Sequence, residues 1–160
     1  MKIEPGKEEF LKLAGLGNLI PVTRRILADF ETPLSAYQKI RGEGESFLCE
    51  SVEGGERIGR YSFVGCNPRA VIRQTGGLVE VTENGKVTER YALPGVVDTG
   101  GAPATGRVRD GLEVVEQVMQ RFHAVPRPGL RRFTGGAMGF IVPIYTIVIV
   151  LFFLFTILKV

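Results

Sequence analysis

The sequence has few of the side chains that build most catalytic and metal sites. Its 160 residues include one histidine and two cysteines. His123 ends a helical pattern with no acidic residue or nucleophile beside it, so we expect a surface position. Cys49 and Cys66 lack the spacing of a metal site and are expected to be buried free thiols. This scarcity argues against a Ser-His-Asp triad, a metal centre and any catalytic residue in the chain.

A strong charge of either sign is also missing. The chain has 20 Lys and Arg residues against 17 Asp and Glu residues, a net charge of +3. The pairs Arg24-Arg25 and Arg131-Arg132 are isolated, with no aromatic residues between basic ones, so a nucleic-acid partner is not expected. The first seventeen residues are charged and amphipathic rather than a secretory signal. Together with reduced thiols, this favours a cytoplasmic location.

One long hydrophobic run occurs near the end of the sequence, where residues 141–158 read IVPIYTIVIVLFFLFTIL. As a helix this run would reach about 27 Å, close to the hydrocarbon thickness of a bilayer. Its Ile, Val and Phe content and Pro143 also permit a pair of buried strands. A frameshifted or truncated reading frame is the interpretation we favour over a membrane anchor.

Helix signals occur at three places. Residues 7–16 read as a short amphipathic helix, and Thr32-Pro33 supplies a cap and a first-turn proline for a second helix ending near Gly42. Asp110 precedes the third and clearest helix, with Glu113 placed as in a capping box. Four residues of this helix form one apolar stripe and are expected to pack in the core: Leu112, Val115, Met119 and Phe122.

The remaining patterns favour strands. SFLCESV and YSFVGC read as two of them, and LVEVTENGKVTERYAL predicts a hairpin with a type I′ turn at Asn84-Gly85. Residues 94–108 are rich in Gly, Pro, Ala and Thr and predict a surface loop. FTGGAMGFI reads as a strand of small residues. The order of elements favours an α+β fold, with antiparallel sheet layers and packed helices.

The stretch FLCESVEGGERIGRYSFVG, from residue 47, is the best candidate for a binding site. Alternation along a strand places Leu48 and Glu50 on the same face, and the Gly-Gly turn brings a second strand alongside. A free amino acid needs an acid for its ammonium, a polar partner for its carboxylate and an apolar pocket. Glu50, Ser51 and Arg60 supply the polar groups. The simpler alternative is a surface ion pair.

Several motifs in this region resemble anthranilate synthase component I, the chorismate-using subunit at the start of tryptophan biosynthesis. They are Asp29 before Thr32-Pro33, Leu48-Cys49-Glu50-Ser51, Gly59-Arg60-Tyr61-Ser62-Phe63 and the FTGGAMGFI strand. The likeness runs from about Pro21 to Ile141 and is to the N-terminal region of the family. After Ile141 the family continues into a large domain, whereas this sequence changes to Val142-Pro143 and the apolar run.

The resemblance implies that the chain is part of a feedback site for L-tryptophan. It assigns Leu48, Glu50, Ser51 and Arg60 to inhibitor binding, Arg60 on the weakest grounds. It places the chorismate site, the Mg²⁺-binding carboxylates and the rest of the tryptophan pocket in the absent domain. No catalytic or metal-binding residue is therefore expected here, although the full family uses Mg²⁺ and a glutamine amidotransferase subunit.

The sequence accordingly predicts three segments: a helical segment over 1–20, the family domain over 21–141 and an apolar tail over 142–160. The domain is an incomplete part of the family fold, without activity alone. Two alternatives stay open. One is a fragment of the related aminodeoxychorismate synthase, and the other is a membrane-tethered, non-catalytic amino-acid sensor.

Overall fold

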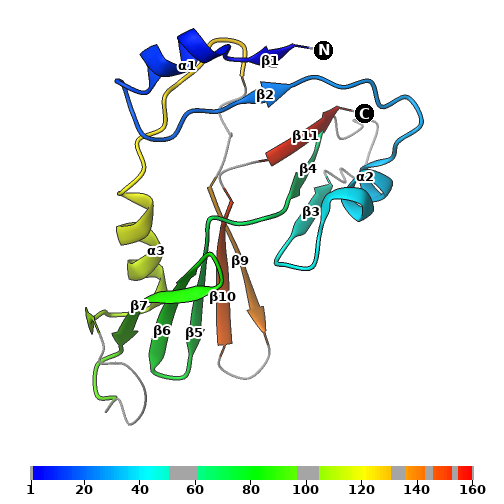
Figure 1. The fold of residues 1–160 in the computed structure, drawn as a ribbon. Helices are drawn as coiled ribbons and strands as arrows, with labels where there is room; N and C mark the ends of the chain where they lie inside the picture. The colour runs from blue at the N-terminus through cyan, green and yellow to red at the C-terminus, as the bar shows by residue number, and fades with distance from the viewer. Residues whose placement is uncertain are drawn as a thin grey trace, which may run out of the picture. The chain divides into compact units, whose positions relative to one another are not determined.

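The computed structural model describes residues 2–50, 61–96, 105–130, 136–142, 146–152 and 155–159. The chain folds into two compact units, and it passes between them more than once (Figure 1). The first comprises Met1–Asn67, Phe122–Gly135 and Phe153–Val160. The second comprises Pro68–Arg121 and Gly136–Phe152. Neither unit is therefore one continuous stretch of sequence.

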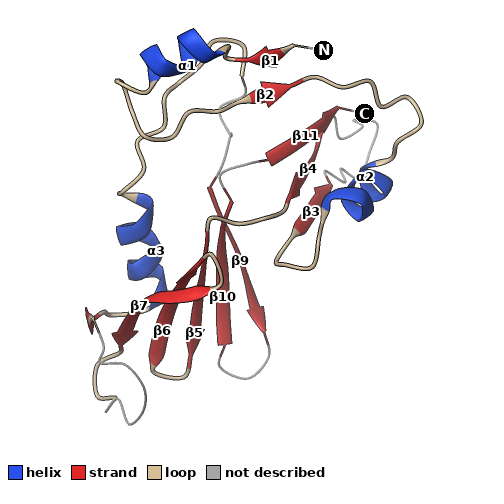
Figure 2. Ribbon diagram, in the orientation of Figure 1, coloured by secondary structure: helices blue, strands red, loops and turns tan. Residues whose placement is uncertain are grey.

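The first unit contains a three-stranded antiparallel sheet in the order β11-β4-β3 (Figure 2). The sheet is preceded along the chain by two short helices and a two-stranded antiparallel pair. The elements of this unit are β1 (Ile3–Glu4), α1 (Lys7–Leu13), β2 (Thr23–Arg24), α2 (Pro33–Ile40), β3 (Phe47–Glu50), β4 (Tyr61–Gly65) and β11 (Phe155–Lys159).

The second unit contains a six-stranded sheet in the order β8-β7-β6-β5-β10-β9 and one helix. All its strand pairs are antiparallel except β7 with β8. Its elements are β5 (Ala70–Thr75), β6 (Leu78–Glu83), β7 (Lys86–Ala92), β8 (Gly106–Arg107), α3 (Gly111–Met119), β9 (Gly136–Val142) and β10 (Thr146–Phe152). The predicted α+β fold with antiparallel sheets is confirmed.

Local sequence signals fixed several boundaries correctly. Asn84 and Gly85 have φ angles of 51° and 74°, as the predicted type I′ turn between β6 and β7 requires. Thr32 caps α2 by accepting a hydrogen bond from the Ser35 amide, and Gly42 has a φ of 60°. These signals act over two to four residues, so no distant contact is needed to make them effective.

The apolar run forms strands rather than a helix. Residues Thr146–Phe152 pair with both β5 and β9, and Phe155–Lys159 pairs with β4. Ile, Val and Thr favour extended backbone because their branched Cβ restricts χ1 in a helix. Within the described parts of the chain, no helix is long and apolar enough to cross a membrane. The described residues of the run therefore form two strands that belong to different sheets and do not pair with each other. The frameshift interpretation stays a prediction.

The buried face of α3 differs from the predicted stripe. Gly111, Val114 and Val118 are buried, Val115 and Met119 are half-buried, but Leu112 is 62% exposed. The helix also ends at Met119, before Phe122. Its start is held from the sheet, because the Gln74 side-chain oxygen accepts a hydrogen bond of 2.9 Å from the Gly111 amide. Helical periodicity gives no information about this contact with β5.

The predicted cap of α3 is present with one change. Asp110 accepts a hydrogen bond of 2.9 Å from the Glu113 amide, as an N-cap residue should. The Glu113 carboxylate, however, accepts from the amide of Arg109, one residue before the cap. Both bonds satisfy donors at the helix start, where backbone amides have no partner within the helix.

Part of the loop predicted over residues 94–108 belongs to the sheet. Gly106–Arg107 pairs in parallel with Tyr91 and Ala92 of β7, and Val108 is only 4% exposed. The surface-loop prediction is wrong for these residues, since a two-residue strand leaves no alternating pattern that could reveal it. Residues 97–104 lie outside those that the structure describes.

A charged cluster connects β7 to the residues just after α3. Arg121 donates two hydrogen bonds to the Glu89 carboxylate, one of them 2.7 Å, and the Tyr91 hydroxyl donates to the same carboxylate. The bond from Arg121, helped by that from Tyr91, lowers the pKa of Glu89. Burial, together with the Glu89 carboxylate, raises the pKa of Tyr91.

Glu89→Gln is expected to remove a stabilising contribution that depends on pH. A carboxyl whose pKa is lowered by folding stabilises the fold above its unfolded pKa, about 4.3, and loses that contribution as the pH falls through its folded pKa. At pH 7 the free energy of unfolding of the variant should therefore be about 2 kcal/mol lower than that of the wild type. The difference from the wild type should shrink below about pH 4.

Urea unfolding at a series of pH values measures this difference. Glu83→Gln is the matched control, because Glu83 makes only a 3.9 Å contact with Arg69. A difference between the wild type and Glu89→Gln that stays constant from pH 7 to the acid range would contradict the role assigned to the carboxylate.

Candidate functional site

The candidate site is built on the antiparallel pair of β3 and β4. The register places Leu48 opposite Val64 and Glu50 opposite Ser62. Directly opposed residues share a face, with Cβ atoms roughly 5 Å apart. Leu48 and Glu50 also share that face, because alternate residues of a strand point the same way. The predicted pairing of these two strands and the common face of Leu48 and Glu50 are confirmed.

Burial changes along this shared face. Val64 is fully buried and Ser62 is 4% exposed, whereas Leu48 is half-buried and Glu50 is exposed. Along this face, the apolar side chain of Leu48 is therefore followed by the solvent-accessible carboxylate of Glu50. This is the combination that a ligand with an apolar side chain and an ammonium group requires.

Two of the four predicted site residues, Ser51 and Arg60, lie outside the described part of the chain. Their assignment to the site stays a prediction. In sequence, Ser51 directly follows β3 and Arg60 directly precedes β4.

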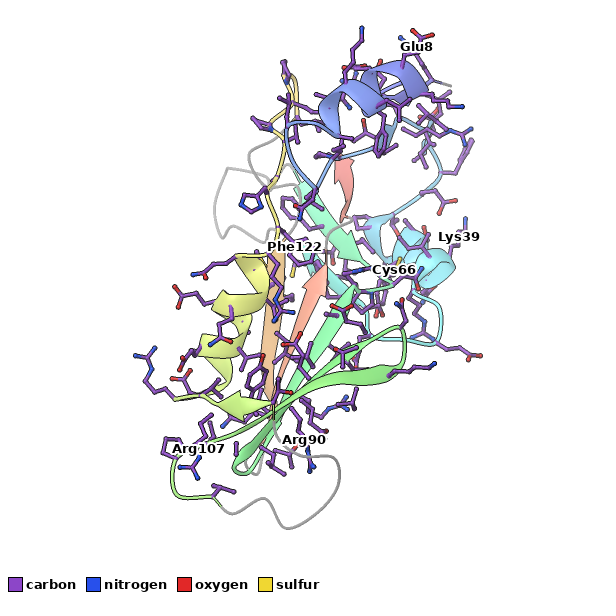
Figure 3. All side chains as sticks on the ribbon, turned by 60° about the vertical axis from the view of Figure 1, so that its left-hand side comes forward. Glu8, Lys39, Cys66, Arg90, Arg107 and Phe122 are labelled. Carbon is purple, nitrogen blue, oxygen red and sulfur yellow. The ribbon has the colours of Figure 1, made fainter. Side chains whose placement is uncertain are left out.

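Helix α2 contacts both β3 and β4 and helps to hold the pair in place. The Tyr37 and Ser46 hydroxyls share a hydrogen bond of 3.0 Å, which links the middle of α2 to the residue before β3. Glu31 precedes the helix, and its carboxylate accepts hydrogen bonds from Lys39 and Ser35. The bond from Lys39 and, to a smaller extent, the bond from Ser35 lower the pKa of Glu31. Figure 3 marks Lys39 on this helix.

Neither cysteine forms a disulfide, as predicted, but both are half-buried rather than buried. Cys49 lies on the opposite face of β3 from Leu48 and Glu50, opposite Phe63. The Phe47 ring lies on the same face and explains why residue 65 is a glycine. A Cβ atom at position 65 would lie 2.1 Å from the Phe47 ring, too close for any larger residue. The cysteine between Leu48 and Glu50 thus does not face the candidate site.

Sequence reasoning missed Ser62 and Val64 as members of the site face. Both lie within the Gly-Arg-Tyr-Ser-Phe motif or directly after it, so the motif pointed to the correct strand. The register remained hidden, because it depends on the turn type and on where each strand ends, and the sequence of the long connection between the two strands specified neither.

The described residues contain no group of three or more His, Cys, Asp or Glu side chains placed to hold a metal ion. His123 is exposed, as predicted, and its backbone amide donates a hydrogen bond to the Asn18 side chain.

Comparison with known proteins gives a consistent set of relatives. Anthranilate synthase component 1 of Pseudomonas putida and that of Pseudomonas aeruginosa are each 40% identical to this chain over 135 residues. In both cases the match covers 84% of this chain and 24% of the relative. The Synechocystis protein of the same name is 39% identical over 139 residues, covering 86% and 24%. No family model matches the chain.

These matches cover most of the chain but only a small part of the relatives. The chain spans about a quarter of the length of the curated relatives it matches. At 34% to 40% identity over such a length, the similarity reflects common descent rather than shared composition. The motifs noted in the sequence and the comparisons therefore point to the same enzyme, of which this chain corresponds to a part.

Proposed function

Because the chain carries a region of anthranilate synthase component 1, we propose that it forms one wall of a feedback site for L-tryptophan. In this proposal the chain regulates the synthesis of anthranilate from chorismate and ammonia or glutamine, and it does not itself perform the reaction. The observation that carries the proposal is the face shared by Leu48 and Glu50 on β3.

The chemistry of that face matches the ligand at two points. The exposed Glu50 carboxylate neutralises the ammonium group of the amino acid, and a charge-assisted hydrogen bond there is shorter and stronger than a neutral one. The half-buried Leu48 contacts its apolar side chain. The Ser51 hydroxyl and, less directly, the Arg60 guanidinium lie next to these residues in sequence and contact the polar end of the ligand.

The remaining parts of the enzyme belong, in this proposal, to polypeptide beyond the matched region. The chorismate site and the Mg²⁺-binding carboxylates are carried there, as is the opposite wall of the tryptophan pocket. A glutamine amidotransferase subunit supplies ammonia to the complete enzyme. The described residues offer no carboxylate cluster to which the metal can be assigned, so no step of the reaction is derived for this chain.

A hybrid enzyme tests the proposal. The 135 aligned residues of the Pseudomonas putida relative are replaced by those of this chain. Anthranilate formation is followed by its fluorescence at increasing tryptophan concentration. We expect inhibition by tryptophan and none by phenylalanine at the same concentration. An active hybrid that tryptophan does not inhibit would remove the basis of the proposal.

The isolated chain is expected to produce no anthranilate and to bind tryptophan weakly, because it presents only one wall of the pocket. Chorismate with ammonium and Mg²⁺ should yield no fluorescent product above a blank without protein. The Pseudomonas putida enzyme serves as the positive control. Anthranilate formation by the chain, or micromolar tryptophan binding by calorimetry, would contradict this expectation.

A further inference from the structure

Strand β11 pairs with the strand that carries the buried residues of the candidate site. In the sheet order β11-β4-β3, β4 is the central strand, and its two edges pair with segments far apart in the sequence (Figure 1). Ser62 is in register with Glu50 of β3 on one side and with Leu158 of β11 on the other. Ser62 and Val64, the buried residues of the site face, both belong to β4.

Without β11, the site face would be built on two strands only. An isolated pair of strands is marginally stable in water, and a third strand or a packed helix is needed to stabilise it. Helix α2 contacts β3 and β4, but none of its eight residues is buried, so it removes little apolar surface from water. The pair therefore depends on the third strand.

Strand β11 is also anchored through β10. Only two residues separate Phe152, the last residue of β10, from Phe155, the first residue of β11. Within the six-stranded sheet, β10 lies between β5 and β9 and pairs with both. A short connection to a strand held on both sides lowers the entropic cost of bringing β11 to β4.

The ladder of β4 with β11 and that of β5 with β10 differ in register by one residue. Gly65 is opposite Phe155, and the next pair is Ala70 opposite Leu151. Four residues therefore separate the paired positions on one side and three on the other, which is the offset of a β-bulge. Asn67 is one of the four and has a φ of 52°, a left-handed conformation that asparagine adopts more readily than most residues. The extra residue is accommodated there, so both ladders can form together.

We propose that β11 is a strap that holds the candidate site face in its folded form. While β11 is paired, β4 is an interior strand with a partner on each edge. When β11 leaves, β3 and β4 lose their stable pairing, whereas the six-stranded sheet stays folded because β10 remains in it. The inference concerns the conformation of the face and does not depend on which ligand the face binds.

Native-state hydrogen exchange of the complete 160-residue chain, in increasing urea and without tryptophan, tests the strap. We expect the amides of β3, β4 and β11 to lose protection together, at a lower urea concentration than those of β6. Protection of β4 at a urea concentration where β11 exchanges freely would overturn the proposal. Loss of protection in all four strands at one urea concentration would also overturn it.

Ile157→Pro combined with Leu158→Pro releases the strap directly. Adjacent amides of a strand point to opposite sides, so one of these two points to β4, and proline has no amide hydrogen. We expect the amides of Tyr61–Gly65 to exchange at least about tenfold faster than in the wild type, with exchange of Leu78–Glu83 unchanged. Wild-type exchange of Tyr61–Gly65 in this variant would contradict the proposal.

The matched control is Ile157→Val combined with Leu158→Val, which changes the same two positions but keeps both amides and favours extended backbone. Its exchange should match that of the wild type. Equal exchange of Tyr61–Gly65 in the two double variants would overturn the proposal. If the proline variant loses both sheets, the urea series decides, because it uses the unaltered chain.

Discussion

Val114→Asp is expected to destabilise strongly the unit that contains the six-stranded sheet. Val114 is fully buried on α3, and this helix contacts β5 of the sheet. A carboxylate at this position would be buried without a partner, at a cost of about 4 kcal/mol or more. Because a domain of this size is stable by about 5 to 15 kcal/mol, the substitution should remove a large part of the free energy of unfolding.

Leu112→Asp is the matched control for this prediction, since it places the same side chain on the same helix. Leu112 is 62% exposed and lies in the first turn, where a negative charge interacts favourably with the helix dipole. Its free energy of unfolding should change by no more than about 0.5 kcal/mol. Urea unfolding followed by circular dichroism measures both variants. If Leu112→Asp lowers the free energy of unfolding more than Val114→Asp does, the buried face of α3 is the one predicted from the sequence and not the one described here.

The contrast between these two positions shows what the sequence could and could not predict about the fold. The existence of α3 and its cap at Asp110 followed from adjacent residues. Its rotation did not, because several overlapping sets of apolar residues satisfy helical spacing. Packing against the sheet selects one of them, and the bond from Gly111 to Gln74 shows how distant such a partner is, since it joins positions 37 residues apart. Periodicity carries no information about such a partner.

The apolar run illustrates the same limit on a larger scale. Mean hydropathy alone fitted a membrane helix, and only the β-branched residues and Pro143 favoured strands. The pairing of β10 with β5, and of β11 with β4, joins segments far apart in the sequence. Strand formation here depends on those partners, because extended backbone leaves its hydrogen bonds to be made between strands.

The common face of Leu48 and Glu50 was predicted from the sequence for a physical reason. Residues two apart on a strand share a face, so Leu48 and Glu50 could be placed together from the sequence alone. Ser62 and Val64 could not be placed opposite them, because that requires the register. The family resemblance is the source of the proposed ligand, which neither the spacing nor the geometry specifies.

Glu50→Gln in the hybrid enzyme is expected to raise the tryptophan concentration that gives half-inhibition by about thirtyfold or more. The substitution keeps the shape of the side chain and its hydrogen-bonding capacity but removes the charge opposite the ligand ammonium. Loss of one member of such a charge pair costs about 2 to 5 kcal/mol when the pair is shielded from water in the complex. The loss should be in tryptophan affinity, because Glu50 is assigned to the inhibitor and not to chorismate.

Inhibition curves for the wild-type hybrid, Glu50→Gln and Glu43→Gln measure this effect. Glu43 is the matched control, since it is exposed and lies before β3. It should leave the half-inhibitory concentration unchanged. An unaltered curve for Glu50→Gln would mean that the carboxylate does not face the ligand, and the surface ion pair would then be the better interpretation. Because β3 alternates its faces, such a result would also remove Leu48 from the pocket, since both residues share one face.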